Sequence, residues 1–115
     1  MIALVWQFKA RSGREAAFEQ FFGANGPWQR MSRRSRSFLG SSFLRDIAQP
    51  TRYLVAEYWS EMLPYEKHQA DYSDEVRELE RERNELLDEM AAIGVFAALD
   101  VPERTGPTWS RRSAG

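Results

Sequence analysis

The stretch that decides the fold is Tyr53-Leu-Val-Ala-Glu-Tyr-Trp-Ser-Glu-Met-Leu-Pro-Tyr-Glu-Lys-His-Gln-Ala-Asp-Tyr72. Its first half, residues 53–59, mixes aromatic and β-branched side chains, which suit the half-buried surface of a sheet. We therefore predict a strand there. Alternation along this strand places its odd-numbered side chains, including Glu57 and Trp59, on one face.

The second half of the stretch has the pattern of a helix. Ser60 is a suitable N-cap, and Pro64 is close enough to the first turn to be tolerated. Tyr65, His68 and Tyr72 follow at spacings of three and four residues, so they share one helix face. The predicted strand thus leads into a helix that carries the chain's only histidine, and a site, if there is one, lies between the two.

The first part of the chain predicts another strand and helix. Residues 2–9 alternate between strongly apolar and mixed side chains, which indicates a strand buried on both sides. Ser12 is expected to cap the following helix, and Glu15 completes a capping box. An apolar stripe at helical spacing is expected to pack against a sheet, and it consists of Ala17, Phe18, Phe21 and Phe22.

A short helix is predicted from Pro27 to about Arg34, because proline fits the first helical position. Four arginines fall within seven residues, at positions 30, 33, 34 and 36. They could form a patch for anions or nucleic acid, or a solvated face that pairs with acidic residues elsewhere. We favour the solvated face because the chain as a whole is not basic.

A second strand is predicted over residues 38–47. Its small residues at positions 40–42, Gly-Ser-Ser, leave room for a bulky group to approach. A turn over residues 46–51 leads to the strand 53–59, so the two are expected to pair as an antiparallel hairpin. Alternation puts Phe38 on one face of this strand and places on the other Leu39, Ser41, Phe43 and Arg45.

Residues 73–101 have the pattern of a helix followed by a strand. Ser73 offers an N-cap for an amphipathic helix over residues 74–93, whose apolar seam is interrupted by Arg83. Gly94 is expected to end this helix. The short apolar run over residues 95–101 then predicts the last strand.

The order strand, helix, strand, strand, helix, strand predicts an α+β fold. It is the ferredoxin-like βαββαβ arrangement, a four-stranded antiparallel sheet with helices on one face. We expect this domain over residues 1–101 and a flexible tail over residues 102–115, in which Trp109 could anchor on a partner subunit. Because the first and last strands are apolar on both sides, a second copy packed on the open face would make a homodimer.

Composition limits the possible partners. The chain has 115 residues, 43% of them hydrophobic and 29% charged, which is ordinary for a globular domain. Its net charge of −1 gives no field that favours nucleic acid or an anionic membrane. It has no cysteine, so thiolate catalysis and cysteine-based metal sites are excluded. No signal peptide or membrane span is evident, and a cytoplasmic location is expected.

Several short motifs occur together in this chain. They are Val5-Trp6-Gln7-Phe8, Ser12-Gly13-Arg14-Glu15, Gly26-Pro27-Trp28, Phe38-Leu39-Gly40, Tyr53-Leu54, Trp59-Ser60 and the spacing from Trp59 to His68. Together they resemble the antibiotic biosynthesis monooxygenase family of dimeric α/β barrels, over about residues 1–100. The resemblance implies a homodimer whose two sheets form one barrel, with a cleft in each subunit between sheet and helices.

The resemblance bears on cofactors. Some members oxidise aromatic polyketides with oxygen and neither metal nor flavin, and relatives bind and degrade haem. Haem degraders use an asparagine on the first strand, a tryptophan on the third and a helix histidine that ligates iron. Trp59 and His68 match the last two, but the asparagine position falls at about Trp6, with Gln7 beside it. We therefore expect no cofactor, and weak haem binding at most.

The resemblance and the residues together predict a cofactor-independent monooxygenase-like protein that acts on an aromatic small molecule. His68 is the candidate base, because no other side chain here has an unperturbed pKa near neutrality. Glu57 is a further candidate, which would need Arg45 or Arg52 as a partner if buried. The alternative is a non-catalytic dimeric module that binds a hydrophobic ligand or haem. The expected pocket walls are Trp6, Trp59, Tyr65 and Tyr72.

Overall fold

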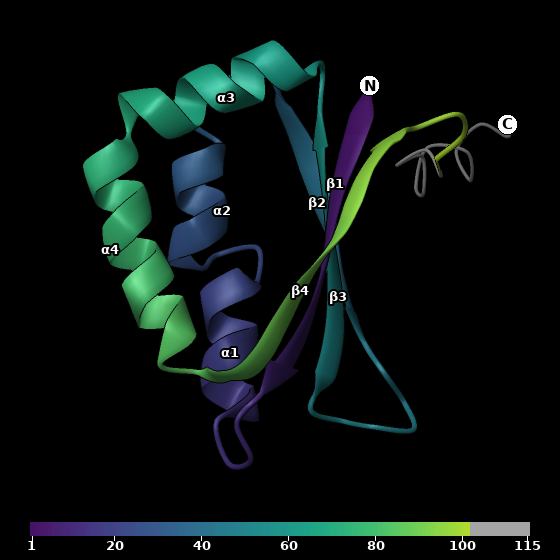
Figure 1. Ribbon diagram of the computed structural model, residues 1–115, viewed down its shortest axis with the longest axis vertical. Helices are drawn as coiled ribbons and strands as arrows, with labels where there is room; N and C mark the ends of the chain where they lie inside the picture. Colours follow the sequence, from purple (N-terminus) through teal and green to yellow (C-terminus); the bar gives the residue numbers. More distant parts are fainter. Residues whose placement is uncertain (102–115) are drawn as a thin grey trace, which may run out of the picture.

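The computed structural model describes residues 1–101, and they form the predicted α+β ferredoxin-like fold (Figure 1). Four antiparallel strands lie in the order β2-β3-β1-β4, with the helices against one face. The tail predicted over residues 102–115 lies outside the described residues. The elements are β1 (Ile2–Ala10), α1 (Glu15–Phe22), α2 (Pro27–Ser32), β2 (Phe38–Arg45), β3 (Arg52–Trp59), α3 (Met62–Asp71), α4 (Ser73–Asn84) and β4 (Leu87–Ala97).

The pairing of β1 with β3 sets which side chains face the helices. Phe8 lies opposite Tyr53, and Leu4 lies opposite Glu57. Directly opposed residues share a face, so these four point into the helix layer together. All four are buried, and along β3 every odd-numbered side chain is buried. The predicted alternation of residues 53–59 is therefore confirmed.

The core between sheet and helices is built mainly from aromatic rings. Phe18 of α1 is fully buried, and its ring centroid lies 5.5 Å from that of Phe8, 5.1 Å from that of Phe22 and 4.8 Å from that of Tyr53. These distances are typical of tilted aromatic pairs, which add to the energy of burial. The predicted packing of this stripe against the sheet is confirmed.

The predicted helix over residues 74–93 is wrong in its second half. Helix α4 ends at Asn84, and the chain enters β4 at Leu87. The edge of β1 accounts for the difference, because it offers backbone groups with which residues 87–97 pair, except at two bulges. Gly94 therefore does not end a helix. It lies at a bulge in β4 with φ of +155°.

The second strand also differs from its prediction. A bulge shifts the register, so that Phe38 lies opposite Trp59 and Gly40 lies opposite Tyr58. Phe38 thereby joins the helix-facing side, with its ring centroid 5.4 Å from that of Trp59. Simple alternation placed it on the other face. Gly40 adopts φ of +122°, which few other residues tolerate, and the strand ends at Arg45 rather than at residue 47.

None of the predicted serine caps forms. Residues 12 and 13 make a turn in which the Arg14 N–H binds the Arg11 carbonyl, and α1 begins only after it. Glu61, not Ser60, precedes α3, and no side chain caps it. At Ser73 no cap is needed, because Tyr72 carries the chain from α3 into α4 with backbone bonds to both helices. Helix α2 ends at Ser32, two residues before its predicted end.

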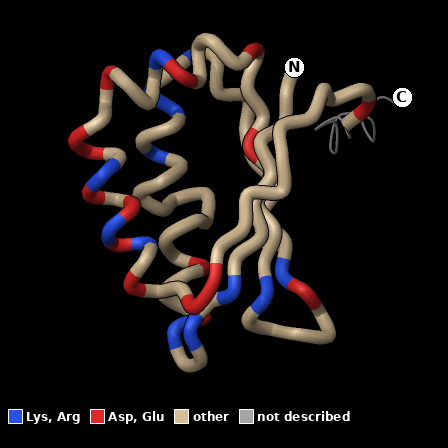
Figure 2. The backbone as a smooth tube through the Cα atoms, viewed as in Figure 1, with Lys and Arg blue, Asp and Glu red and all other residues tan. Residues whose placement is uncertain are grey.

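Acidic and basic residues are interspersed along α4 (Figure 2). Arg34 pairs with Glu75 at 2.6 Å, and Arg30 donates to the Asn25 carbonyl. This pairing supports the solvated-face interpretation of the four arginines. Among the described residues, no helix is both long and apolar enough to cross a membrane.

Candidate functional site

The end of β3 and the inner face of α3 bring four of the predicted site residues together. Trp59 is fully buried, and its ring centroid lies 5.4 Å from that of His68 and 5.3 Å from that of Tyr65. The ring of Tyr72 lies 4.8 Å from that of His68. The three-and-four spacing on α3 thus predicted which side chains meet at the sheet.

His68 lies inside this group of rings, with 4% of its surface exposed. Its Nε2 atom is buried and has no hydrogen-bond partner among the described residues. Burial lowers the pKa of the imidazole from its usual 6.5, and a backbone hydrogen bond at Met31 opposes this only in part. The ring is therefore neutral near pH 7, and a neutral imidazole with an unpartnered nitrogen can accept a proton.

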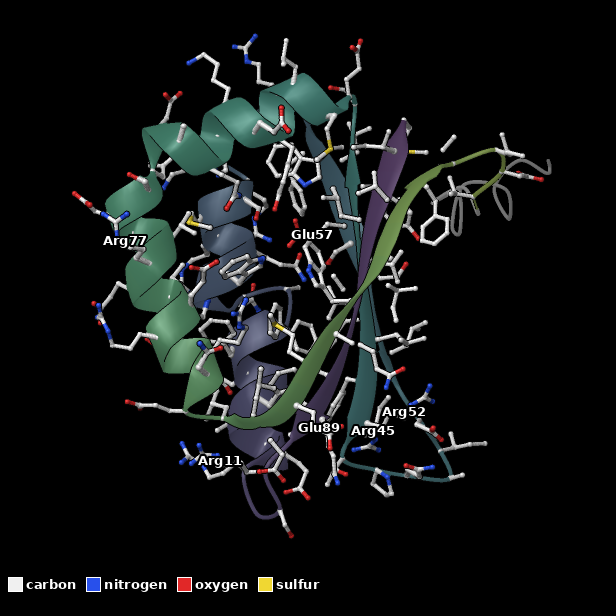
Figure 3. The ribbon with its side chains drawn as sticks, in the orientation of Figure 1. Arg11, Arg45, Arg52, Glu57, Arg77 and Glu89 are labelled. Atoms are coloured by element: carbon white, nitrogen blue, oxygen red, sulfur yellow. The ribbon has the colours of Figure 1, made fainter. Side chains whose placement is uncertain are left out.

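Glu57 lies on the same face of β3 and is buried between the sheet and the helices (Figure 3). Its Oε2 accepts a hydrogen bond from the Trp28 indole, and its Oε1 accepts one from the Trp59 indole at 3.1 Å. Burial raises the pKa of this carboxyl, while the two indole N–H groups favour its charged form. Both oxygens are thus occupied by aromatic donors.

The predicted arginine partners of Glu57 are wrong. Arg45 pairs with Glu19 at 3.0 Å, and Arg52 pairs with Asp46 at 2.8 Å. Both arginines lie at the far end of their strands, well away from Glu57 (Figure 3). The sequence allowed no choice between indole and guanidinium donors, since Trp28 reaches β3 only through the packing of α2.

Tyr65 contributes a phenol that stays protonated. Burial, and after it the charge of Glu57, raises the pKa of this phenol to about 12. Tyr65 can therefore donate a hydrogen bond throughout the physiological range. The ring of Tyr72 makes a cation–π contact instead. The guanidinium of Arg34 lies over it, 5.3 Å from the ring centroid.

Arg83 is a residue that our site prediction missed. It is only 8% exposed, yet its guanidinium donates to the neutral side chain of Asn84, at 3.2 and 3.0 Å, and forms no ion pair within residues 1–101. Burial lowers its pKa, while the nearby Glu80 and Tyr65 favour its charge. The signal was present in the sequence as a charged residue within the apolar seam of a helix. A buried cation without a carboxylate is suited to an anionic ligand.

Trp6 is the predicted wall that lies apart from the histidine. It faces the helix layer between Val55 and Ala92, and it packs against the aromatic core. The rings in contact with the imidazole are those of Trp59 and Tyr72. The structure therefore does not bring Trp6 into the group around His68.

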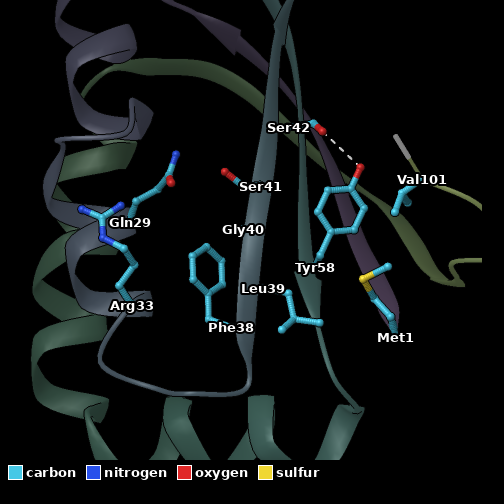
Figure 4. Close-up of a pocket in the computed structure, with 10 residues that line it drawn as sticks. All are labelled: Met1, Gln29, Arg33, Phe38, Leu39, Gly40, Ser41, Ser42, Tyr58 and Val101. Carbon is cyan, nitrogen blue, oxygen red and sulfur yellow. Dashed lines mark hydrogen bonds between the residues drawn. The ribbon is translucent and has the colours of Figure 1, made fainter. Parts of the chain in front are cut away.

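A large hollow lies elsewhere, at the edge strand β2 (Figure 4). Its volume is about 760 Å³, and no predicted site residue lines it. The small residues at positions 40–42, predicted to leave room on this strand, form part of the wall of the hollow. The bulge in β2 lies in the same part of the wall. The lining consists of Met1, Gln29, Arg33, Phe38, Leu39, Gly40, Ser41, Ser42, Tyr58 and Val101.

The residues around the imidazole do not fit haem. An axial histidine must present a nitrogen to open space that is large and flat enough for a porphyrin. Here Nε2 is buried, and two aromatic rings lie about 5 Å from the imidazole. Among residues 1–101, moreover, no group of three or more acidic or histidine side chains is arranged to hold a metal ion.

Comparison with known families agrees with these features. The sequence profile of the family described as antibiotic biosynthesis monooxygenase matches residues 1–79, more than half of the chain. The chain belongs to this family. Curated protein sequences give no match.

Solved structures of this family share the fold. SnoaB, a cofactor-independent oxygenase from Streptomyces nogalater, is 20% identical with a TM-score of 0.69, over 89% of this chain and 97% of SnoaB. A Deinococcus radiodurans protein assigned to the family is 16% identical with a TM-score of 0.69, over 90% and 97% of the two chains. A Bordetella bronchiseptica protein, likewise assigned, is 21% identical with a TM-score of 0.68, over 86% and 97%.

Proposed function

We propose that this family member is a cofactor-independent monooxygenase that oxidises an electron-rich aromatic small molecule of the polyketide type between the sheet and α3. The observation that carries the proposal is the buried Nε2 of His68, which lies among aromatic rings and has no hydrogen-bond partner within residues 1–101. A positioned base that is unprotonated near pH 7 is what a phenolic substrate needs in order to lose its proton. The oxygenase SnoaB, which shares the fold, supports the same class of reaction.

The proposed chemistry starts with proton transfer from the substrate phenol to His68. The resulting phenolate passes an electron to dioxygen far more readily than the phenol does. For a substrate with a ring CH₂ group, one oxygen atom becomes a ring carbonyl, and the other leaves as water with the two hydrogens of that carbon. Dioxygen therefore supplies the whole oxidising power, and the protein supplies the base, the dry surroundings and the orientation.

Three further side chains have roles in this proposal. Trp59 forms an apolar wall, and the neutral Tyr65 phenol donates a hydrogen bond to a substrate oxygen. The buried guanidinium of Arg83, which forms no ion pair with a carboxylate within residues 1–101, stabilises the phenolate once the proton has moved. A preorganised cation at a developing negative charge is a major source of rate acceleration.

The proposal is tested by oxygen uptake with 1,8-dihydroxyanthrone, a phenolic polycycle with a ring CH₂ group. The purified chain, treated with a chelator, is expected to consume one dioxygen per molecule of anthrone and to release the quinone. Anaerobic samples and the heat-denatured chain serve as controls. A rate equal to that without protein, for this and related phenolic polycycles, would remove the enzymatic half of the proposal.

A non-catalytic binding module is the second candidate. The enclosure of His68, which is only 4% exposed, favours it, since a ligand could be held by the rings without reaching the base. This module would bind the same anthrone, measured by quenching of tryptophan fluorescence, and would leave it unoxidised. Saturable binding without oxygen uptake would decide for this alternative.

A second copy of the chain is the proposed partner. The sheet face opposite the helices carries Val5 opposite Ala56, and Leu44 opposite Leu54. Leu44 and Phe96 are 57% and 48% exposed, which is more apolar surface than a lone sheet usually leaves to water. We expect a homodimer at micromolar concentration, with a total buried area of about 2,000 Å² or more.

Sedimentation velocity tests the dimer. Leu44→Glu is expected to shift the chain toward monomer, because it puts a charge into the buried face. Leu63→Glu is the matched control, since Leu63 is 74% exposed and lies on α3, away from that face. A wild-type chain that sediments as a stable monomer at micromolar concentration would contradict the prediction.

A further inference from the structure

We infer that Glu57 is a positioning residue: its carboxylate binds the indoles of Trp28 and Trp59 and thereby fixes both the aromatic wall and the backbone that hold His68. The catalytic consequence of this inference rests on the proposed function. The hydrogen-bonded arrangement itself does not.

The carboxylate is placed for two indole donors and little else. Glu57 is 2% exposed, and each of its oxygens accepts from a different ring. A buried carboxylate is costly unless it is hydrogen-bonded, and bonds to a charged acceptor are about twice as strong as neutral ones. The two indole N–H groups therefore offset part of the cost of burying Glu57, and the carboxyl oxygens in turn fix both rings.

The fixed rings lie on two routes to His68. On the first route, Trp59 is bound to Glu57 and its ring is in contact with the imidazole. On the second, Trp28 anchors α2 to β3, and the backbone at Met31 of α2 lies near enough to the imidazole of His68 to favour its protonated form. These contacts connect Glu57 on β3 with His68 on α3 both directly along β3 and through α2. A change at Glu57 therefore reaches the imidazole from both sides.

The same geometry argues against Glu57 as the base or as a substrate contact. A general base needs an oxygen free to take the substrate proton. Both carboxylate oxygens here are already bound to indole N–H groups. Glu57 acts through Trp59 and through α2. The imidazole of His68 has a nitrogen with no hydrogen-bond partner in the described part of the chain.

The experiment compares Glu57→Gln with the matched control Glu19→Gln. An amide keeps the size of the side chain but offers one acceptor oxygen instead of two, so one indole loses its partner. Glu19 also accepts two donors, from Tyr53 and Arg45, but at the opposite end of β3. The pair separates loss of a carboxylate in general from loss of this one.

Two NMR readouts are independent of activity. In Glu57→Gln the indole N–H signals of Trp28 and Trp59 are expected to move, and the pKa of His68 is expected to rise toward its usual value as water reaches a loosened ring. Glu19→Gln is expected to leave all three unchanged. With anthrone, kcat/KM of Glu57→Gln is expected to fall about 10²-fold, the scale of a 1 Å misplacement.

Each result of these measurements either supports or overturns the positioning role of Glu57. Unmoved indole signals would overturn the inference, and so would moved indoles with an unchanged His68 titration. If the wild type lacks oxygenase activity, the proposed function fails while the two NMR readouts still decide the inference. If Glu57→Gln does not fold, Trp28→Phe removes one donor and keeps an aromatic ring. That variant is expected to raise the His68 pKa through α2, and an unchanged titration would overturn the second route.

Discussion

His68→Ala is expected to lower kcat for a phenolic substrate by about 10²–10⁴-fold, the usual contribution of a positioned proton-transfer group. The alanine removes the one imidazole in the chain, and the ring wall formed by Trp59 and Tyr72 stays in place. KM is expected to change much less than kcat, because the walls that hold the substrate remain. Steady-state oxygen uptake over a range of anthrone concentrations measures both constants.

Lys67→Ala is the control for this variant. Lys67 lies about 100° around the same helix and points outward, where it pairs with Asp71 at 2.7 Å. It is expected to retain full activity, since an exposed pair contributes little. Equal activity of both variants on a verified substrate would show that His68 is not the base.

The pH dependence gives a second check on the histidine. Burial lowers the pKa of His68 below its usual 6.5, so the free base is available at lower pH than for an exposed imidazole. Activity is therefore expected to rise with pH through an apparent pKa below 6.5 and then to level off. The lowered pKa also affects stability. The unfolded chain binds the proton more tightly than the folded chain, so the free energy of unfolding is expected to decrease as pH falls below 6.5.

Phe18→Ala is expected to destabilise the fold by about 3–5 kcal/mol, the usual cost of a phenylalanine removed from a core. Phe18 has no exposed surface, and its ring lies against those of Phe8, Phe22 and Tyr53. Small domains are stable by only about 5–15 kcal/mol, so this variant is expected to be partly or wholly unfolded at 37 °C. Urea denaturation followed by circular dichroism measures the change.

Ile47→Ala is the control for the core variant. Ile47 is 99% exposed in the turn after β2, so its truncation is expected to change the free energy of unfolding by less than about 0.5 kcal/mol. The two substitutions remove apolar side chains of similar chemistry from opposite environments. A Phe18→Ala chain that unfolds at the same urea concentration as Ile47→Ala would contradict the aromatic core described above.

Local periodicity was enough to predict the parts of the chain whose structure is set by near neighbours. The alternation in β3 and the three-and-four spacing of Tyr65, His68 and Tyr72 placed these side chains correctly. In both cases a face is fixed by backbone geometry alone. The same signals predicted the order of the strands and helices and the ferredoxin-like fold.

Periodicity failed where a partner strand decides the structure. Residues 87–93 carry apolar side chains at spacings that suit a helix, yet they extend to pair with β1. The bulge that moves Phe38 to the face of Trp59 is likewise visible only in the register with β3. Hydrogen bonds to a distant strand are worth more here than local preference, and a single sequence does not say which edge is free.

The sequence by itself therefore determined the fold, the family resemblance and which residue types meet at the end of β3. The tertiary structure alone decided the state of each group. Glu57 is bound by two indoles, and within residues 1–101 the buried Arg83 forms no ion pair and Nε2 of His68 has no hydrogen-bond partner. Burial and hydrogen bonding depend on contacts between α2, α3, α4 and the sheet. Those contacts join residues far apart in the chain, so no local pattern records them.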